Sequence, residues 1–344
     1  MYRKIFLITM SSILILISSC KDDSITGPSS QPGRRDYTWT IDTLHMTLTF
    51  VEAIWGSSPE DVWVCGPGGD PALWLQHYDG KKWTPYTKNI TCGGTSLFGF
   101  SKNDVWMGGD NASLWHYDGN VWTEKFEYKY QDAMTIINSV YGVSPDDIYA
   151  CGVIIPPPGN EYDKFSGFIL HYNGRSWQEV FAGNPSFQFL KVRKYQGKVF
   201  LSAYSISKQT IAFYELKDGR LKEIYSNPPG ESTSCNFDYI GDNFYFWIDK
   251  DVCEYELGHF IKLFSIYDEK YFHYIFGRSG KDIFVSMFDG LAHYNGSDIQ
   301  YVLKYNGELQ LIGGNPVLFD KEFFCAYCDR VTFKNMVLHG RLKE

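Results

Sequence analysis

A nine-residue motif occurs four times in this chain, and its spacing limits the possible folds more than any other feature. Each copy reads aromatic–Gly–x–Ser–x–x–Asp–aliphatic–aromatic, and the copies span Trp55–Trp63, Phe98–Trp106, Tyr141–Tyr149 and Phe276–Phe284. Their aspartates lie 43, 43 and 135 residues apart, and 135 is three times 45. A repeat of about 40–45 residues indicates a fold built from similar units.

Each of these motif copies is followed by a short apolar run and a glycine-containing turn. The turns contain the pairs Asp79-Gly80, Asp118-Gly119, Asn173-Gly174 and Asn295-Gly296. Such pairs predict hairpins, because Asp, Asn and Gly all tolerate positive φ. We therefore expect about four short antiparallel strands in each repeat, which is the content of one β-propeller blade.

Weaker repeats at 191–219, 237–258 and 309–340 bring the predicted number of blades to seven. The last repeat ends before its fourth strand, whereas Tyr37–Thr43 precedes the first repeat and looks like a fourth strand without a blade. We predict an all-β, seven-bladed propeller of four-stranded antiparallel blades, in which this N-terminal strand completes the seventh blade. Closing the ring removes exposed strand edges, which promote aggregation.

These repeats resemble those of kelch-like and sialidase-repeat (Asp-box-like) bacterial propellers. The resemblance lies in the Asp-Val-Trp strand, in Gly108-Gly109 and in the Tyr-Asp pair ahead of tryptophan, and it covers about residues 37–344. It implies the propeller fold and no particular activity. The true Asp box spaces its residues differently, and Gly108-Gly109 is the clear example here of a kelch-type glycine pair.

The N-terminus predicts a lipoprotein signal peptide over residues 1–19. Two basic residues precede the apolar run Ile5–Ile17, and the sequence up to Cys20 then resembles a bacterial lipobox, in which Cys20 is lipidated. An ordinary secretory signal with a chance cysteine is the alternative. Residues 20–36 are predicted to be the lipidated cysteine and a flexible tether, and residues 37–344 the propeller domain.

The predicted location is the envelope of a Gram-negative bacterium, as an outer-membrane lipoprotein anchored through Cys20. Cys20-Lys21-Asp22-Asp23 also resembles a surface-export signal, so surface exposure and a periplasmic orientation both stay open. The net charge of −8, without a Lys/Arg cluster, argues against a nucleic-acid partner. We expect a monomer without cofactor, and we see no second membrane segment.

Seven cysteines follow Cys20. Cys65, Cys151 and roughly Cys325 occupy equivalent positions in different blades, so we expect buried small residues and no bonds between them. Strand signals flank Cys325-Ala326-Tyr327-Cys328, which favours a structural role over redox or zinc chemistry. Disulfide pairing stays open for Cys92, Cys235, Cys253, Cys325 and Cys328.

Repeated polar residues are interpreted as parts of the scaffold. One histidine recurs per blade around the ring, so pairing within its blade is expected and a metal site is not, for His77, His116, His171, His293 and His339. The motif aspartates are expected to cap their turns, for Asp61, Asp104, Asp147 and Asp282. The repeated tryptophans and tyrosines should form the core between blades. A specific site is therefore expected where the repeats differ.

Strand order separates two faces of the ring. The first-to-second and third-to-fourth strand turns share one face, which we call the constant face, and the remaining loops form the variable face. We expect recognition on the variable face, because loops on a rigid scaffold commonly carry binding residues. The alternative is that these loops simply vary and partly bury their aromatic residues. The candidate ligand-binding residues are Tyr128, Tyr130, Asp132, Glu161, Tyr162, Asp163, Lys164, Tyr267, Asp268, Tyr271 and His273.

The expected function is a lipid-anchored binding or scaffolding module for an envelope protein or a glycan. The alternative is a carbohydrate-active enzyme with two carboxylates close together on the variable face. Its motif is not visible, and neither is a serine nucleophile elbow, a phosphate loop or a calcium loop. No catalytic residue is predicted, and an envelope protein without any ligand is a third option.

Overall fold

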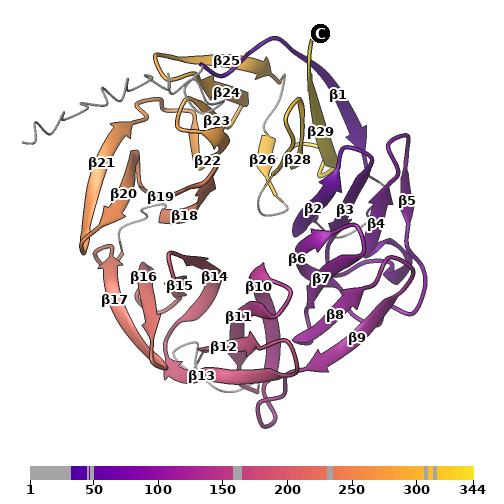
Figure 1. Ribbon diagram of the computed structural model, residues 1–344, viewed down its shortest axis with the longest axis vertical. Helices are drawn as coiled ribbons and strands as arrows, with labels where there is room; N and C mark the ends of the chain where they lie inside the picture. The colour runs from indigo at the N-terminus through magenta and orange to yellow at the C-terminus, as the bar shows by residue number, and fades with distance from the viewer. Residues whose placement is uncertain are drawn as a thin grey trace, which may run out of the picture.

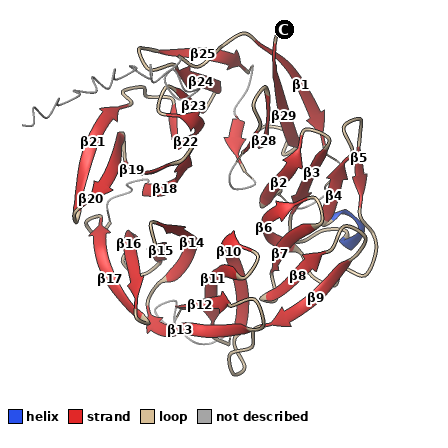
Figure 2. Cartoon of the chain, viewed as in Figure 1, coloured by secondary structure: helices blue, strands red, loops and turns tan. Residues whose placement is uncertain are grey.

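The computed structural model describes residues 32–44, 46, 50–157, 165–230, 235–305, 309–312 and 316–344. These residues form seven antiparallel sheets arranged as blades around a central axis (Figure 1). Strands dominate the described chain, and its one helix is the short 3-10 turn η2 (Pro71–Leu73) (Figure 2). The prediction of an all-β, seven-bladed propeller is thus confirmed.

Blades 1 to 3 each contain four consecutive strands, which pair in chain order from the inside of the ring to the outside. Their strands are β2 (Ala53–Ser58), β3 (Asp61–Cys65), β4 (Leu75–Tyr78) and β5 (Trp83–Pro85); β6 (Gly94–Ser101), β7 (Asp104–Gly109), β8 (Ser113–Tyr117) and β9 (Trp122–Glu127); β10 (Met134–Ser144), β11 (Asp147–Ile155), β12 (Ser166–Tyr172) and β13 (Trp177–Pro185).

Blades 4 to 6 repeat this order, and blade 7 takes its strands from both ends of the chain. Their strands are β14 (Gln188–Tyr195), β15 (Lys198–Ser205), β16 (Thr210–Lys217) and β17 (Arg220–Ser226); β18 (Cys235–Ile240), β19 (Asn243–Ile248), β20 (Asp251–Glu256) and β21 (His259–Ser265); β22 (Tyr271–Ser279), β23 (Asp282–Met287), β24 (Gly290–Tyr294) and β25 (Ile299–Lys304); β26 (Leu309–Leu311), β27 (Val317–Leu318), β28 (Glu322–Asp329), β29 (Asn335–Leu342) and β1 (Tyr37–Thr43).

The ring is closed by the pairing of β1 with β29, which confirms the predicted role of the N-terminal strand. The two strands are antiparallel over seven residue pairs, from Tyr37 opposite Leu342 to Thr43 opposite Met336. Tyr37 is buried, and its ring packs edge-on against Phe323 of blade 7 with centroids 5.4 Å apart. The inner strand of this blade is interrupted, since β26 and β27 both pair with β28.

Repeated aromatic residues fill the space between neighbouring blades, as predicted. Trp63 of blade 1 contacts the rings of Tyr117 and Trp122 of blade 2, with centroids 5.1 Å and 5.6 Å apart. Trp106 of blade 2 meets Trp177 of blade 3 in the same way, at 5.5 Å. Edge-to-face pairs of this kind contribute about 0.5–1.5 kcal/mol each beyond their burial.

The motif glycine leaves room for the aromatic side chain of the preceding blade. A Cβ atom on Gly99 of blade 2 would lie 2.6 Å from the Trp55 ring of blade 1, a distance that real Cβ atoms do not adopt. The aromatic–Gly pair therefore lets the inner strands of neighbouring blades approach closely. Any blade that lacks this pair must line the centre of the ring differently.

Chain direction places every inner strand in the same orientation. Each begins at the variable face and ends at the constant face, where its turn leads to the second strand. The segment before β1 lies on the constant face, because Gly33 N–H donates to Lys281 O (2.8 Å) and Arg35 donates to Asp298 O (2.5 Å) in turns of blade 6. No helix within the described ranges is long and apolar enough to cross a membrane.

Candidate ligand-binding site

A pocket of about 510 Å³ lies at the centre of the ring, where all seven inner strands converge. Because these strands share one direction, their early residues line the end nearer the variable face, and their later residues line the end nearer the constant face. The first group is Glu52, Thr95, Asn138, Leu190 and Pro316, and the second is Trp55, Phe98, Tyr141, Arg193, Asp238, Tyr239 and Phe276.

The register of the strands shows that this pocket is where the repeat is broken. In blade 1 the motif aromatic Trp55 lies opposite Trp63 of the second strand. The equivalent position, opposite an aromatic residue of the second strand, is Arg193 in blade 4 and Asp238 in blade 5. Two neighbouring blades thus replace an aromatic packing residue with opposite charges, both in the central pocket.

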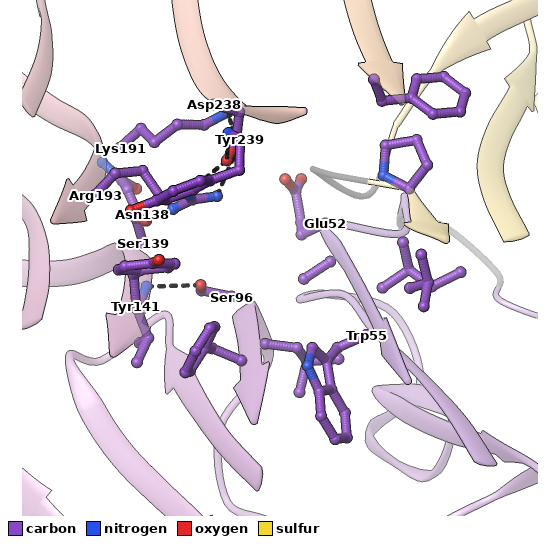
Figure 3. Close-up of a pocket in the computed structure, with 18 of the residues that line it drawn as sticks. Glu52, Trp55, Ser96, Asn138, Ser139, Tyr141, Lys191, Arg193, Asp238 and Tyr239 are labelled. Atoms are coloured by element: carbon purple, nitrogen blue, oxygen red, sulfur yellow. Dashed lines mark hydrogen bonds and ion pairs between the residues drawn. The ribbon is translucent and has the colours of Figure 1, made fainter. Parts of the chain in front are cut away.

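These charges form a compact ion cluster with Lys191, which we call the central cluster (Figure 3). Arg193 binds Asp238 through two parallel bonds of 2.9 Å, from Nε to Oδ1 and from Nη2 to Oδ2. Lys191 Nζ donates to Asp238 Oδ2 at 3.0 Å, and the Tyr239 N–H donates to Asp238 Oδ1 at 2.8 Å. The Asp238 carboxylate therefore accepts four hydrogen bonds, which uses its acceptor sites fully.

Burial and mutual attraction set the charge states of the cluster. Burial opposes ionisation of Asp238, but the charges of Arg193 and Lys191 outweigh it and hold the Asp238 pKa well below its usual range. Burial lowers the pKa of Lys191 to about 8, against the attraction of Asp238. All three groups are charged at neutral pH, and together they carry one positive charge.

Aromatic rings surround the two cations. The Arg193 guanidinium lies over the Tyr141 ring of blade 3, 4.9 Å from its centroid. Lys191 Nζ lies 5.7 Å from the Tyr274 ring of blade 6. Both distances fall within the range of cation–π attraction. The central cluster therefore links blades 3 to 6 across the inner surface of the ring.

Glu52 faces the central cluster from the other side of the ring, where its carboxylate projects into the pocket (Figure 3). Its N–H donates to Cys65 O at 2.8 Å, which holds the residue directly ahead of the inner strand β2. The side chain is accessible from the pocket, yet the protein around it excludes enough water to raise its pKa. Within the described part of the chain, its carboxylate makes no hydrogen bond or ion pair.

The candidate residues chosen from the sequence do not line this pocket. Tyr128 and Tyr271 are buried in the core, and Tyr128 donates to Glu179 at 2.6 Å and stacks on Phe168. Tyr267 is 76% exposed on the variable face, beside Asp268. Asp132 is also exposed there, next to the half-buried Tyr130.

The other predicted positions fall where less is described. His273 belongs to β22. Cys20 and the loop residues Glu161, Tyr162, Asp163 and Lys164 lie outside the described residues.

Arg193 and Asp238 are recognised as exceptions to the repeat only when the register of their strands is known. Blades 4 and 5 lack the Gly–x–Ser–x–x–Asp motif, so their inner strands cannot be aligned without a pairing partner. Where that alignment is made, Lys194 and Tyr239 occupy the position of the motif glycine. The expectation that a site lies where the repeats differ leads to this pocket, on the inner strands instead of the loops.

Each repeated histidine pairs with the carboxylate that begins the second strand of its own blade, as predicted for the scaffold; this is the motif aspartate in four blades and Glu322 in blade 7. The Nε2-to-carboxylate distances run from 2.6 to 2.9 Å for His77–Asp61, His116–Asp104, His171–Asp147, His293–Asp282 and His339–Glu322. The expected turn-capping role falls to serine instead, since Glu60 N–H donates to Ser58 Oγ and Asn103 N–H to Ser101 Oγ, both at 3.3 Å.

The described residues contain no group of three His, Cys, Asp or Glu side chains that could hold a metal ion. Their cysteines are free, buried thiols, so the open question of disulfide pairing resolves to none among Cys65, Cys92, Cys151, Cys235, Cys253, Cys325 and Cys328. Burial raises the pKa of Cys92 to about 11 and that of Cys325 well above the usual value. Thiolate chemistry is correspondingly unfavourable there.

Comparison with known proteins finds solved structures of similar fold but no related sequence family. No family model and no curated protein matches the chain. The solved structure of YCF48 bound to D1 peptide is 14% identical, with a TM-score of 0.61 over 92% of this chain and 100% of that chain. Oligogalacturonate lyase in complex with manganese is 11% identical, with a TM-score of 0.63 over 91% and 99%.

BamB from Moraxella catarrhalis is 11% identical, with a TM-score of 0.51 over 89% of this chain and 99% of that chain. At such identities the likeness shows the fold alone. The chain is a seven-bladed β-propeller, and blades 4 and 5 differ from the others in the charged residues that they place in the central pocket.

Proposed function

We propose that this protein is a lipid-anchored, extracytoplasmic binding module that holds a polypeptide segment of a partner in the central pocket. The observation that carries the proposal is the break in the repeat at Arg193 and Asp238, inside a cavity of about 510 Å³. Cavities of about 300–1,000 Å³ are typical of ligand sites. The variable-face loops that carry Tyr130, Asp132, Tyr267 and Asp268 would form the rim of that site.

Two features favour a protein partner over a glycan. Apolar side chains are exposed on the variable face, namely Phe50 (45%), Met134 (55%), Val331 (70%) and Phe333 (70%). Inside the pocket, the ring of Tyr141 contacts Arg193 and stacks on Tyr239, which leaves less of its face for a sugar. YCF48, a propeller of similar fold, has been solved with a bound peptide.

The anchor would hold the ring by its constant face. Residues 32–36 lie against that face, through Gly33 and Arg35. A lipid on Cys20 would therefore be joined to the ring on the side of the constant face. Replacement Cys20→Ala should abolish incorporation of labelled fatty acid and move the protein to the soluble envelope fraction; a variant that stays labelled would contradict lipidation at Cys20.

Binding can be tested with the full chain, a random-peptide phage library and a glycan array. Leu190→Trp should obstruct the pocket, because Leu190 is 39% exposed and lines it. Val143→Trp is the matched control, since Val143 is 49% exposed near the constant-face end of an inner strand. We expect peptides that bind the wild type and Val143→Trp but not Leu190→Trp. Glycans with that pattern would change the class of partner, and ligands indifferent to Leu190→Trp would rule out the pocket.

A carbohydrate-active enzyme is the second candidate, because Glu52 and Asp238 line one pocket and their pKa values shift in opposite directions. Asp238 is poorly suited to act as a nucleophile or base, since Arg193, Lys191 and a backbone N–H occupy its oxygens. Release of reducing sugar from an oligosaccharide panel by the wild type, lost in Glu52→Gln, would favour the enzyme.

A further inference from the structure

We propose that the segment held in the pocket presents a basic group, an amine or a guanidinium, to the carboxylate of Glu52. This inference rests on the proposed function and adds the chemistry of the ligand. It follows from three properties of the pocket: how its positive charges are satisfied, where the carboxylate lies that has no partner among the described residues, and which rings lie beyond that carboxylate.

The positive charges of the pocket already have partners. Arg193 uses Nε and Nη2 for Asp238 and Nη1 for Val192 O at 2.7 Å and Ser139 Oγ at 3.4 Å. Lys191 binds Asp238 and lies near the Tyr274 ring. An acidic ligand that took over the bidentate face of Arg193 would have to displace Asp238, which leaves a buried carboxylate without its strongest partner.

Glu52 has the opposite character. Its carboxylate projects into the cavity, and no partner for it occurs among the described residues. The surrounding protein raises its pKa because it weakens the solvation of the negative charge. A ligand cation would restore that stabilisation, and the attraction would be stronger than in water because the pocket excludes part of the solvent.

The rings beyond Glu52 suit the body of a basic side chain. Trp55 lies on β2, which begins directly after Glu52 and runs towards the constant face. Phe98 and Tyr141 occupy the equivalent positions of the next two blades. Trp55 and Phe98 are only half-buried, so their surfaces contribute to the pocket. Aromatic faces attract ammonium and guanidinium groups and pack against the methylene stems of Lys and Arg.

The test compares peptides selected from one random-peptide phage library by four forms of the full chain: wild type, Glu52→Gln, Glu52→Lys and Glu60→Gln. Glu60 is an exposed glutamate in the constant-face turn of the same blade, so Glu60→Gln is the matched control. Peptides that also bind Leu190→Trp are discarded, because they bind outside the pocket. Thermal unfolding of each variant shows that the fold is retained.

We expect peptides enriched in Lys and Arg with the wild type and with Glu60→Gln. Glu52→Gln should lose that enrichment and bind the selected peptides on the order of tenfold to a hundredfold more weakly, as expected for loss of a charge-assisted hydrogen bond. Glu52→Lys should reverse the preference towards acidic peptides. Such a reversal cannot result from a general loss of structure.

Two failures are distinguishable. If pocket-dependent peptides are found but show no basic residues, or are acidic, the proposed function holds and the role of Glu52 is wrong. If no peptide distinguishes the wild type from Leu190→Trp, the proposed function itself fails. Equal selection by Glu52→Gln and the wild type would also overturn the inference, whatever the peptides contain.

Discussion

Arg193 and Asp238 show how one position can serve packing in most blades and charge in two. An aromatic residue there contributes dispersion and burial, whereas a buried ion pair gains little net stability over apolar residues of similar size. Removing only one partner is costly, because the other charge remains desolvated. The central cluster is therefore expected to be sensitive to single substitutions and tolerant of complete replacement.

Asp238→Asn should destabilise the fold by about 3–5 kcal/mol, because Arg193 and Lys191 would remain buried without a counter-charge. Urea unfolding followed by tryptophan fluorescence measures the loss. Asp242→Asn, at an exposed turn of the same blade, is the control and should change stability by less than about 0.5 kcal/mol.

The triple replacement Asp238→Leu, Arg193→Met and Lys191→Met should recover much of that stability, because it removes all three charges together. A triple variant less stable than Asp238→Asn would show that the central cluster stabilises the ring more than apolar packing can.

Glu52 gives a pH dependence of ligand binding. Burial raises its pKa above the ordinary 4.5, and only the ionised form attracts a cation. Affinity for a selected basic peptide should therefore be highest near neutral pH and fall as the pH drops through that raised pKa. Calorimetric titration from pH 7 to about pH 4.5 should show this fall, and Glu52→Gln should bind weakly with no such step. A wild-type affinity independent of pH would contradict the assignment.

Single residues also show what the sequence can reveal. The pairing of each repeated histidine within its blade was predictable from its position alone. Its partner was not, because the motif aspartate had an equally reasonable use in its turn. Glu52 carries no motif at all, and only the folded ring shows that its side chain enters a cavity.

At the scale of strands and turns, the repeat predicted the elements well and their local geometry less well. In Asp79-Gly80 only the glycine has positive φ, at +86°, and the Asp79 carboxylate accepts from the N–H groups of Lys81 and Lys82. In Asp218-Gly219 both residues have positive φ, at +50° and +70°. The same dipeptide thus closes two kinds of hairpin, and the loop length decides which one forms.

The histidine–carboxylate pairs join the second and third strands of their blades, and their contribution should grow with burial. His293 is fully buried and bound to Asp282 at 2.7 Å, whereas His116 is 21% exposed and bound to Asp104 at 2.8 Å. We expect His293→Ala to cost about 2–3 kcal/mol and His116→Ala about 1 kcal/mol or less, because solvent weakens the exposed pair. Urea unfolding of the two variants checks the order; equal losses would show that burial does not govern these pairs.

For the whole molecule, the period of the motif was sufficient to predict the number of blades and the closing strand. The sequence contains seven similar units, the last of which lacks its fourth strand, and one additional strand at the N-terminus. Few arrangements other than a ring closed by that strand accommodate them. The pocket could not be predicted in the same way, because its lining combines residues from every blade, between Glu52 and Leu318. Such residues become neighbours only after the ring has closed.

Ring closure can be tested by truncation. A chain that begins at Leu44 lacks β1 and exposes the edge of β29, while a chain that begins at Pro32 keeps the pairing. The shorter chain should lose at least about 3 kcal/mol, the cost of removing one large buried side chain such as Tyr37, and should aggregate through the free edge. Thermal unfolding and size-exclusion chromatography measure both effects.

A synthetic peptide with the sequence of Tyr37–Thr43, added to the shorter chain, should restore part of the lost stability. Equal behaviour of the two chains would show that β1 is dispensable for closure.

The pairing of β1 with β29 also decides how the proposed anchored protein would respond to mechanical load. β1 enters from the constant face, so a pull between the lipid and a partner on the opposite face would act along the strands. The bonds of all seven residue pairs would then resist together, in shear, instead of opening one after another like a zipper. The pairing of β1 with β29 would therefore be strongest in the direction in which a membrane-anchored binding module is pulled by its partner.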